Sequence, residues 1–291
     1  MTSTPAIRTA AALLIVACGL TGLRSASASV ALPVSPAVQP VSTRQTGAPA
    51  ARTLRGGVET ITIRGRDQVL RLYGPRNGTP VIVSSGDGGW IHLGPHVAEV
   101  LAAKGFFVVG FDVKAYLEGF TSGSTTLRVE DEPGDYRTLI DFAARETGQK
   151  PILVGVSEGA GLSVLAATNP ANKEAIGGVI GLGLSDLTEL GWRWKDMVIY
   201  LTHGTPNEPT FSVKAVVERM APIPLAAIHS TRDEYVPLAQ AQQVLESARQ
   251  PKRLRVVSAS DHRFSGNVAE FDRALLDAIA WITEVHPSVA K

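Results

Sequence analysis

Residues 151–168 read PILVGVSEGAGLSVLAAT: an apolar segment, a Gly-x-Ser-x-Gly turn and a segment rich in alanine and glycine. The pattern predicts a strand, a tight turn and a helix, with Ser157 at the apex of the turn. Glycines on both sides of the serine permit a strained backbone and let the helix pass close to the strand, which a Cβ at either position would obstruct. Ser157 is therefore the candidate nucleophile, although a chain with 28 glycines can produce this motif by chance.

An acid and a histidine follow the serine, each placed just after a predicted strand. The apolar run 224–228 leads into STRDEYVP, which places Asp233 on the loop that leaves a strand. The alternating run 254–257 leads into SASDHRF, which places His262 on the next such loop. Serine, acid and histidine in this order, all at strand ends, are typical of the catalytic triad of α/β-hydrolases.

Strand and helix patterns alternate from residue 57 onwards, which predicts an α/β-hydrolase fold with a mostly parallel central sheet and helices on both faces. The stretch 185–222 breaks this rhythm and holds several aromatic residues without a clear period. It predicts either a small cap over the site or a loop with one helix packed on the sheet edge. The predicted strands are 58–63, 68–73, 80–84, 106–111, 151–154, 178–184, 224–228 and 254–257, with a hairpin turn at 65–67. The predicted helices are 95–104, 131–146, 160–168, 238–248 and 268–285.

A second glycine-rich stretch, SSGDGGW at residues 84–90, directly follows the strand predicted at 80–84. Glycines there let backbone N–H groups approach a developing oxyanion without intervening side chains. The candidate donors are the amide of Asp87 or Gly88 and the amide of Glu158, the residue after the nucleophile. A phosphate-binding loop is the rival interpretation, but no Lys-Ser/Thr pair follows at the spacing that a P-loop requires.

Length and composition predict one catalytic domain, which we place at residues 56–288. A chain of 291 residues with 44% hydrophobic content can bury one substantial core. The net charge is +1, and lysine and arginine are scattered without a basic stripe, so no nucleic-acid partner is expected.

The amino-terminal segment predicts export, to the periplasm or beyond. Arg8 precedes a short apolar stretch at 10–17, which is typical of a signal peptide. Cleavage after the Ala-Ser-Ala at 26–28 would remove residues 1–28; alternatively, Ile-Val-Ala-Cys at 15–18 is a lipobox, and Cys18 becomes a lipid anchor. Residues 29–55 are rich in alanine, proline and serine and predict a flexible tether.

The motifs together resemble the VirJ/AcvB family of exported bacterial proteins. The resemblance rests on the SGDGGW loop, the strand GFFVVGFD at 105–112, the Gly-x-Ser-x-Gly turn and the late Asp-His-Arg-Phe, and it covers about residues 81–281. It implies an α/β-hydrolase domain linked to virulence and type IV secretion, with Ser157, Asp233 and His262 at the triad positions. For AcvB-like members it also implies hydrolysis of lysyl-phosphatidylglycerol at the bond between amino acid and lipid headgroup.

These observations predict a serine ester hydrolase that acts on a small-molecule or lipid ester through an acyl-enzyme. No metal or organic cofactor is expected, since the glycine and proline between His92 and His96 spoil a metal-binding face. Glu234 is the alternative acid, but Asp233 better fits an Asp-x-x-Val-Pro strand exit. Asp87 and Glu158 add negative charge around the predicted oxyanion site, which favours a cationic headgroup.

Three alternatives stay open from the sequence. Further acidic residues at Glu118 and 130–132 either contribute to a cationic-substrate site or are ordinary helix-start and solvated loop residues. The protein is a generic secreted esterase or lipase if neutral esters are preferred. It is a non-catalytic VirJ-like binding module if the hydrolase fold serves only as a scaffold. Association with a membrane surface is expected through a lipid substrate or a lipidated Cys18.

Overall fold

A computed structural model describes residues 55–194 and 208–285, all of which belong to one compact unit, Ala51–Lys291. The predicted signal peptide, the tether and Cys18 lie outside the described residues, so these remain predictions, as do the boundaries of the catalytic domain.

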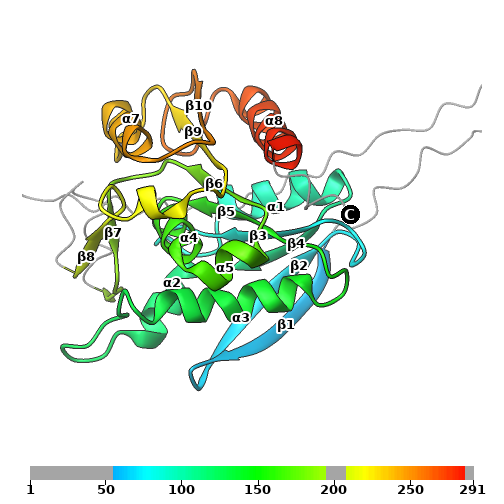
Figure 1. The fold of residues 1–291 in the computed structure, drawn as a ribbon, viewed down its shortest axis with the longest axis vertical. Coiled ribbons are helices and arrows are strands. Elements are labelled where there is room, and N and C mark those ends of the chain that lie inside the picture. Colours follow the sequence, from blue (N-terminus) through cyan, green and yellow to red (C-terminus); the bar gives the residue numbers. More distant parts are fainter. Residues whose placement is uncertain (1–54, 195–207, 286–291) are drawn as a thin grey trace, which may run out of the picture. The chain divides into compact units, whose positions relative to one another are not determined.

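A twisted eight-stranded sheet forms the centre of this unit (Figure 1). Its strands are β1 (Arg55–Ile63), β2 (Arg66–Tyr73), β3 (Pro80–Ser84), β4 (Phe107–Phe111), β5 (Ile152–Val156), β6 (Gly178–Leu182), β9 (Leu225–Ser230) and β10 (Lys252–Val257). The strand order is β1-β2-β4-β3-β5-β6-β9-β10. The pairs β1–β2 and β2–β4 are antiparallel and every other pair is parallel, which confirms the predicted mostly parallel sheet of an α/β-hydrolase fold.

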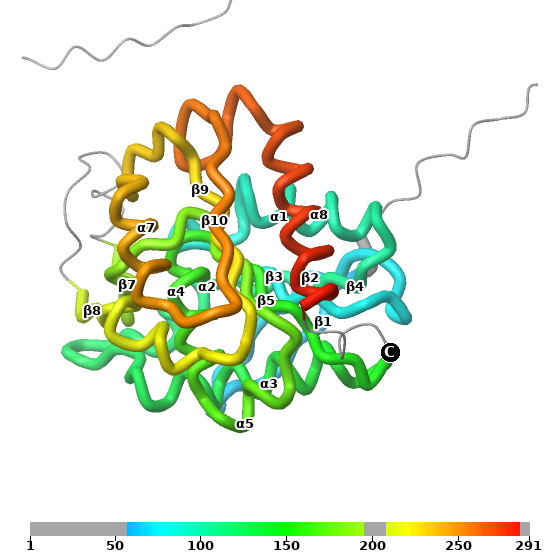
Figure 2. The backbone as a smooth tube through the Cα atoms, turned by 45° about the horizontal axis from the view of Figure 1, so that its top comes forward, coloured from blue at the N-terminus to red at the C-terminus, as the bar shows by residue number. Residues whose placement is uncertain are grey.

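Helices cover both faces of the sheet, which explains why its central strands are apolar along their whole length. The helices are α1 (Leu93–Ala103), α2 (Val113–Phe120), α3 (Glu132–Ala144), α4 (Glu158–Thr168), α5 (Pro170–Ala175), the 3₁₀ helix η2 (Val217–Met220), α7 (Leu238–Ser247) and α8 (Val268–Val285). One core cluster joins α1 and α8 to the sheet, and another joins it to α3, α4 and α7 (Figures 1 and 2). Every residue of β3, β4, β5 and β6 is buried. None of the described helices is long and apolar enough to cross a membrane.

Parallel strands bring their carboxyl ends to one edge, and this edge gathers the loops that carry the candidate residues. The glycine-rich loop follows β3, the serine turn follows β5, and the two loops with the acid and the histidine follow β9 and β10. Val156 at the end of β5 pairs with Leu182 at the end of β6, which places the serine turn beside the loop after β6. The fold therefore assembles the candidate site from segments that are far apart in the sequence.

The structure differs from the sequence prediction at several short elements. Two helices, α2 and α5, were not predicted, although Asp112 caps the first by accepting a hydrogen bond from the Ala115 amide at 3.2 Å. Helix α2 has only eight residues, and it is stabilised by burying one apolar face rather than by helix propensity. The hairpin turn lies at Arg64 and Gly65 rather than at 65–67, because both residues have the positive φ of a two-residue turn.

The described part of the stretch 185–222 consists of residues 185–194 and 208–222 and forms only short elements. It contains a small antiparallel pair, β7 (Leu187–Glu189) and β8 (Thr210–Ser212), followed by η2. Residues 195–207 lie outside the described residues, so a lid over the site remains a prediction.

A buried polar group, the hairpin cluster, comprises Arg64, Tyr116, Glu132 and Asp135 and ties the β1–β2 hairpin to α2 and α3. Arg64 donates two hydrogen bonds to the Asp135 carboxylate, at 2.7 and 2.6 Å, and the Tyr116 hydroxyl donates a third at 2.6 Å. The side chain of Asp135 is 3% exposed, so these three donors offset the cost of burying its charge. Glu132 is fully buried without a hydrogen-bond partner among the described residues, and burial raises its pKa well above the usual value.

Candidate active site

Ser157 lies at a strained turn between β5 and α4. Its φ of 52° and ψ of −116° fall in a region that non-glycine residues rarely occupy. A Cβ on Gly155 would lie 2.1 Å from the Gly159 carbonyl oxygen, and a Cβ on Gly159 would lie 2.4 Å from the Ser85 carbonyl oxygen. The two glycines of the motif are therefore required by close backbone approaches, as the sequence predicts. The Ser157 amide donates to the Leu182 carbonyl at 2.9 Å, which fixes the turn to the end of β6.

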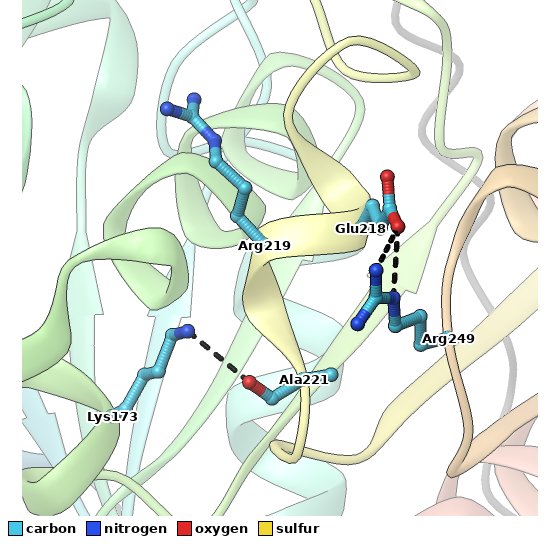
Figure 3. A pocket seen from close by; sticks show the side chains of 5 residues that line it. All are labelled: Lys173, Glu218, Arg219, Ala221 and Arg249. Atoms are coloured by element: carbon cyan, nitrogen blue, oxygen red, sulfur yellow. Dashed lines mark hydrogen bonds and ion pairs between the residues drawn. The ribbon is translucent and has the colours of Figure 1, made fainter.

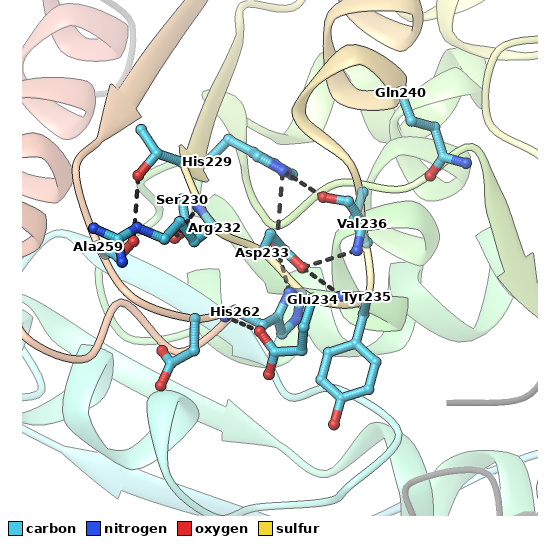
Figure 4. Close-up of polar contacts among 12 residues, drawn as sticks. His229, Ser230, Arg232, Asp233, Glu234, Tyr235, Val236, Gln240, Ala259 and His262 are labelled. Atoms are coloured by element: carbon cyan, nitrogen blue, oxygen red, sulfur yellow. Dashed lines mark hydrogen bonds and ion pairs between the residues drawn. The ribbon is translucent and has the colours of Figure 1, made fainter. Parts of the chain in front are cut away.

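Asp233 lies on the acid loop (231–237) and His262 lies on the histidine loop (258–267), and their side chains contact each other. One carboxylate oxygen of Asp233 lies 2.6 Å from His262 Nδ1 (Figure 4). The other oxygen accepts from the backbone amides of Tyr235 and Val236, at 3.0 and 2.8 Å. Asp233 thus shapes its own loop and holds the imidazole at the same time. Glu234, the alternative acid, does not contact the ring; it accepts a hydrogen bond from the backbone amide of His262 at 2.7 Å.

The environment of this pair shifts the pKa values of both groups. Burial favours the neutral imidazole, but the hydrogen bond to Asp233 and the charges of Asp233, Glu158 and Glu234 outweigh it and raise the pKa of His262. Burial also disfavours the Asp233 carboxylate, yet the bonds from His262 and from the two amides of its own loop lower its pKa. Asp233 is therefore ionised at neutral pH and stabilises a positive charge on the imidazole.

A second buried histidine lies under the acid loop. The Nε2 atom of His229 lies 2.8 Å from the Val236 carbonyl oxygen and 3.7 Å from Asp233 Oδ2. Its side chain is 1% exposed, and burial lowers its pKa despite these neighbours. A neutral imidazole whose Nε2–H donates to the carbonyl fits this position, and it holds the turn that carries Asp233. Nothing in the sequence around His229 distinguishes it from an ordinary core histidine.

A cavity of about 530 Å³ opens at this edge of the sheet, and Ser157 and His262 both line it. Among residues 55–194 and 208–285, neither the Ser157 hydroxyl nor His262 Nε2 has a hydrogen-bond partner, whereas His262 Nδ1 is bonded to Asp233. Gly183, after β6, lies directly beside the imidazole: a Cβ there would come within 2.4 Å of His262 Cε1. In the sequence, the signal for this requirement is weak, since it consists only of a glycine at the end of a buried strand.

The glycine-rich loop passes over the serine turn. A Cβ on Gly86 would lie 3.3 Å from the Ser157 Cβ, and Asp87, Gly88 and Glu158 all line the cavity with the serine. Glu158 is the first residue of α4, so its amide is one of those that no carbonyl within the helix can accept. The structure therefore brings the three predicted oxyanion residues to the serine.

Trp90 anchors this loop to the sheet. Its indole N–H donates to the Tyr73 hydroxyl at 3.1 Å. Its ring packs on β4 so closely that a Cβ on Gly110 would lie 2.3 Å from it. The bulky last residue of GDGGW therefore fixes the backbone of the four small or flexible residues before it.

Carboxylates line one wall of the cavity, but only partly those expected from the sequence. Carboxylate oxygens of Asp87, Glu158 and Glu189 lie within 4.8 Å of one another. Glu208 also lines the cavity, but its carboxylate pairs with Arg193, which offsets its charge. Glu189 and Glu208 flank the stretch 195–207 and were missed, because that region has no periodicity from which a facing could be read. We name these four residues the acidic wall. Among the described residues, the first three are the group whose geometry would suit a cation.

The other acidic residues suggested from the sequence are not part of this wall. Glu118 pairs with Lys114 at 2.9 Å and Glu130 with Arg128 at 3.5 Å. Asp131 pairs with Arg64 at 3.2 Å, and Glu132 is enclosed in the hairpin cluster. The alternative interpretation of these residues, as helix-start and solvated groups, is correct for the first three.

The remaining polar features near the site are ordinary pairings. His92 lines the cavity, whereas His96 points to Asp272, with 2.7 Å between His96 Nε2 and the carboxylate. A second cavity of about 460 Å³ lies away from the serine, between η2 and the ends of α5 and α7 (Figure 3). There Arg249 pairs with Glu218, and Lys173 donates to the Ala221 carbonyl at 3.1 Å.

Comparison with known proteins identifies the family. Residues 79–281 match the family described as bacterial virulence protein (VirJ), and this match spans more than half of the chain. The chain belongs to the VirJ family. The resemblance predicted from its motifs is thereby confirmed, over nearly the predicted range. No curated protein matches this VirJ-family chain.

Solved structures similar to the VirJ-family chain share its α/β-hydrolase fold. The esterase domain of a Rhodothermus marinus protein is 16% identical, with a TM-score of 0.53, and the match covers 80% of this chain and 100% of that one. Est1E from Butyrivibrio proteoclasticus is 15% identical, with a TM-score of 0.56, over 77% of this chain and 99% of that one. Dienelactone hydrolase from Anabaena variabilis is 17% identical, with a TM-score of 0.55, over 78% and 96%. At these identities the likeness establishes the fold alone.

Proposed function

We propose that this VirJ-family protein is a serine hydrolase that cleaves a carboxylic ester through a Ser157–His262–Asp233 triad. One observation carries the proposal: the strained serine turn and the hydrogen-bonded Asp233–His262 pair, 2.6 Å apart, open onto the same cavity. A strained backbone and a buried ion pair both cost free energy, and their convergence at one cavity is expected where they serve catalysis.

Proton transfer follows from the histidine tautomer. Because Nδ1 donates to Asp233, the neutral imidazole carries its lone pair on Nε2, and His262 lines the same cavity as Ser157. There it takes the Ser157 proton as the hydroxyl oxygen attacks the ester carbonyl, and Asp233 stabilises the imidazolium that forms. The imidazolium then protonates the leaving alcohol. Water resolves the acyl-enzyme by the same path.

The oxyanion that forms during attack needs donors that are already in place. The amide of Glu158 at the start of α4 and an amide of the loop at Asp87 or Gly88 would supply them. Trp90 supports this role, because it fixes the loop backbone against β4.

The acidic wall supports the proposal that the substrate is an ester with a cationic group. An aminoacyl phospholipid such as lysyl-phosphatidylglycerol is one example. Carboxylate oxygens of Asp87, Glu158 and Glu189 within 4.8 Å of one another place acidic groups beside the serine, where they favour a cationic group on the substrate. Leu187 and Ile91, both more than half exposed, also line the cavity and suit an apolar part of the same substrate.

Two alternative functions have specific support. The apolar lining also suits a neutral ester, as in a generic esterase or lipase. The absence of a hydrogen bond from the Ser157 hydroxyl to any described residue favours a non-catalytic binding module, although catalytic hydrogen bonds are often loose before substrate binds.

Ester hydrolysis by the purified domain distinguishes these functions. We expect Ser157→Ala to reduce kcat by about 10⁶-fold, as expected when a triad nucleophile is removed. Ser185→Ala is the matched control, because Ser185 lines the same cavity and only donates to the Leu187 carbonyl. Equal activity of wild type and Ser157→Ala would exclude the triad.

Paired esters that differ only in an ammonium group test the substrate class. We expect Asp87→Asn to lower kcat/KM for the cationic ester by about fivefold more than for the neutral one, the value of one partly exposed charge pair. Glu218→Gln removes the same charge at the second cavity and should affect neither ester. A loss that is equal for both esters would reject recognition of the cation.

We further propose that the protein acts after export, in the periplasm or outside the cell. The signal-like segment and its lipobox support this placement. The mass of the mature amino terminus, with or without a diacylglyceryl group on Cys18, would distinguish lipid anchoring from cleavage after residue 28.

A further inference from the structure

His262 is held at both its ring and its backbone by two consecutive acidic residues. Asp233 accepts from the ring nitrogen Nδ1 at 2.6 Å, and Glu234 accepts from the backbone amide at 2.7 Å (Figure 4). Both acceptors lie on the acid loop, and both donors belong to one residue of the histidine loop. Only the first belongs to the catalytic arrangement described above.

The histidine loop is otherwise closed on itself near this point. Asp261 accepts from the amides of Arg263 and Ser265, and the Ser260 amide donates to the Ser265 carbonyl. Nearer β10, Thr231 of the acid loop donates two hydrogen bonds to this segment: its amide to the Val257 carbonyl and its hydroxyl to the Ala259 carbonyl. At His262 itself, the backbone of the histidine loop is therefore bonded to the acid loop through the Glu234 side chain.

This contact is not required by burial of the carboxylate. Glu234 is an exposed residue, and its carboxylate could be solvated by water instead. A hydrogen bond to a charged acceptor is stronger and shorter than a neutral one, and 2.7 Å is typical of such a bond. The bond to Asp233 orients the imidazole ring, whereas the bond to Glu234 acts on the backbone that carries the ring.

We propose that Glu234 is a positioning residue that fixes the backbone of His262, so that Nε2 stays aligned with Ser157. The inference rests on the proposed function of the triad. Glu234 never touches substrate and acts only through His262. A displacement of about 1 Å in a catalytic group can cost up to about 10²-fold in rate, so one backbone hydrogen bond is enough to matter.

Glu234 also contributes charge. The ionisable groups around the His262 ring are Asp233, Glu234 and Tyr235 on the acid loop, His229 on β9, Glu158 at the start of α4 and Arg263 on its own loop. Of these, Asp233, Glu158 and Glu234 raise the pKa of His262. Removing the Glu234 charge therefore shifts the titration of His262 to lower pH.

Two variants separate position from charge. Glu234→Gln retains an oxygen that can accept from the His262 amide but loses the charge, whereas Glu234→Ala loses both. We expect Glu234→Ala to lower kcat by about tenfold with KM changed less than about twofold, since alignment rather than substrate binding is lost. Glu234→Gln should keep kcat within about twofold of wild type above the pKa of His262. Both should shift the acid limb of kcat/KM to lower pH, and Glu218→Gln should shift neither kcat nor the limb.

NMR titration of the His262 imidazole in the Ser157→Ala background keeps this test independent of catalysis. A lower pKa in both Glu234 variants, together with exchange broadening of the His262 amide in Glu234→Ala alone, would support the inference even without a substrate. An unchanged His262 amide and an unchanged kcat in Glu234→Ala would overturn it while leaving the triad intact. Wild-type protein without Ser157-dependent activity would instead overturn the proposed function.

Discussion

The active-site group, which comprises His262, Asp233 and the two loop amides bonded to Asp233, and the hairpin cluster are both polar networks built around a buried aspartate. They differ in where their chains of hydrogen bonds end. In the hairpin cluster, Asp135 is surrounded by donors from Arg64 and Tyr116, and these bonds connect one structural element to another. In the active-site group, the chain of bonds runs from the acid loop through Asp233 to Nδ1 of His262, a residue that lines the same cavity as Ser157. A polar network that closes on itself stabilises the fold, whereas one with an open end at a cavity is available for chemistry.

The largest effect that separates the two networks is expected at Asp233. In Asp233→Asn the amide oxygen can still accept from Tyr235 and Val236, but the amide NH₂ faces Nδ1 and forces the proton onto Nε2. We expect kcat to fall by about 10⁴-fold with the acid loop intact. Steady-state kinetics with a fluorogenic ester and a thermal melt measure the two effects. A loss below tenfold would show that His262 does not need Asp233.

The opposite outcome is expected at Asp135. Asp135→Ala leaves the buried Tyr116 hydroxyl without its acceptor and leaves the partly exposed Arg64 guanidinium with Asp131 alone. We expect a loss of about 3 kcal/mol in the free energy of unfolding, at the low end for a broken buried pair because water still reaches Arg64. Denaturant unfolding measures it, and kcat/KM of the folded variant should stay within about twofold of wild type. A comparable loss of activity would mean that the two networks are coupled.

Glu132→Gln should stabilise the protein at neutral pH. Because burial raises the pKa of Glu132, the folded state keeps a proton that the unfolded state releases above its own, ordinary pKa. The wild type therefore loses stability as pH rises from the unfolded pKa towards the raised folded pKa, and below the unfolded pKa the penalty vanishes. We expect a gain on the order of 1 kcal/mol at pH 7, measured against the same variant at pH 4. A gain that is equal at both pH values would contradict a protonated Glu132.

A smaller effect is expected on the pH dependence of activity. His262 must be neutral to accept the serine proton, and its pKa is raised above 6.5, so kcat/KM should fall as pH drops through that raised value. Glu158→Gln removes one of the charges that raise it and should shift the acid limb to lower pH. Glu246→Gln, on the exposed side of α7, is the control. An acid limb that does not move would show that Glu158 lies too far from the ring to act on it.

The sequence predicted the fold and the chemistry-bearing loops better than their surroundings. Buried parallel strands are short apolar runs bounded by glycine, proline or polar residues, so the strand predicted at 80–84 coincides with β3. The helix predicted at 268–285 likewise coincides with α8. Helix α2 was missed because its stability comes from tertiary burial rather than from its own sequence.

The acidic wall and the positioning contacts could not be predicted for a related reason. Glu189 and Glu208 face the cavity because β7 and β8 pair, and no local pattern encodes that pairing. Glu234 was considered only as a substitute for Asp233, since a sequence cannot show that two neighbouring carboxylates hold the ring and the backbone of one histidine. Such contacts depend on distances between loops, which strand order fixes but composition does not.

The most direct test of the open-ended network is the intact mass of the purified domain after exposure to a fluorophosphonate. We predict one adduct on wild type and on Ser185→Ala, and none on Ser157→Ala, because only a serine activated by His262 attacks the reagent at an appreciable rate. An unlabelled wild type, or an adduct that persists in Ser157→Ala, would contradict the assignment of Ser157 as the nucleophile.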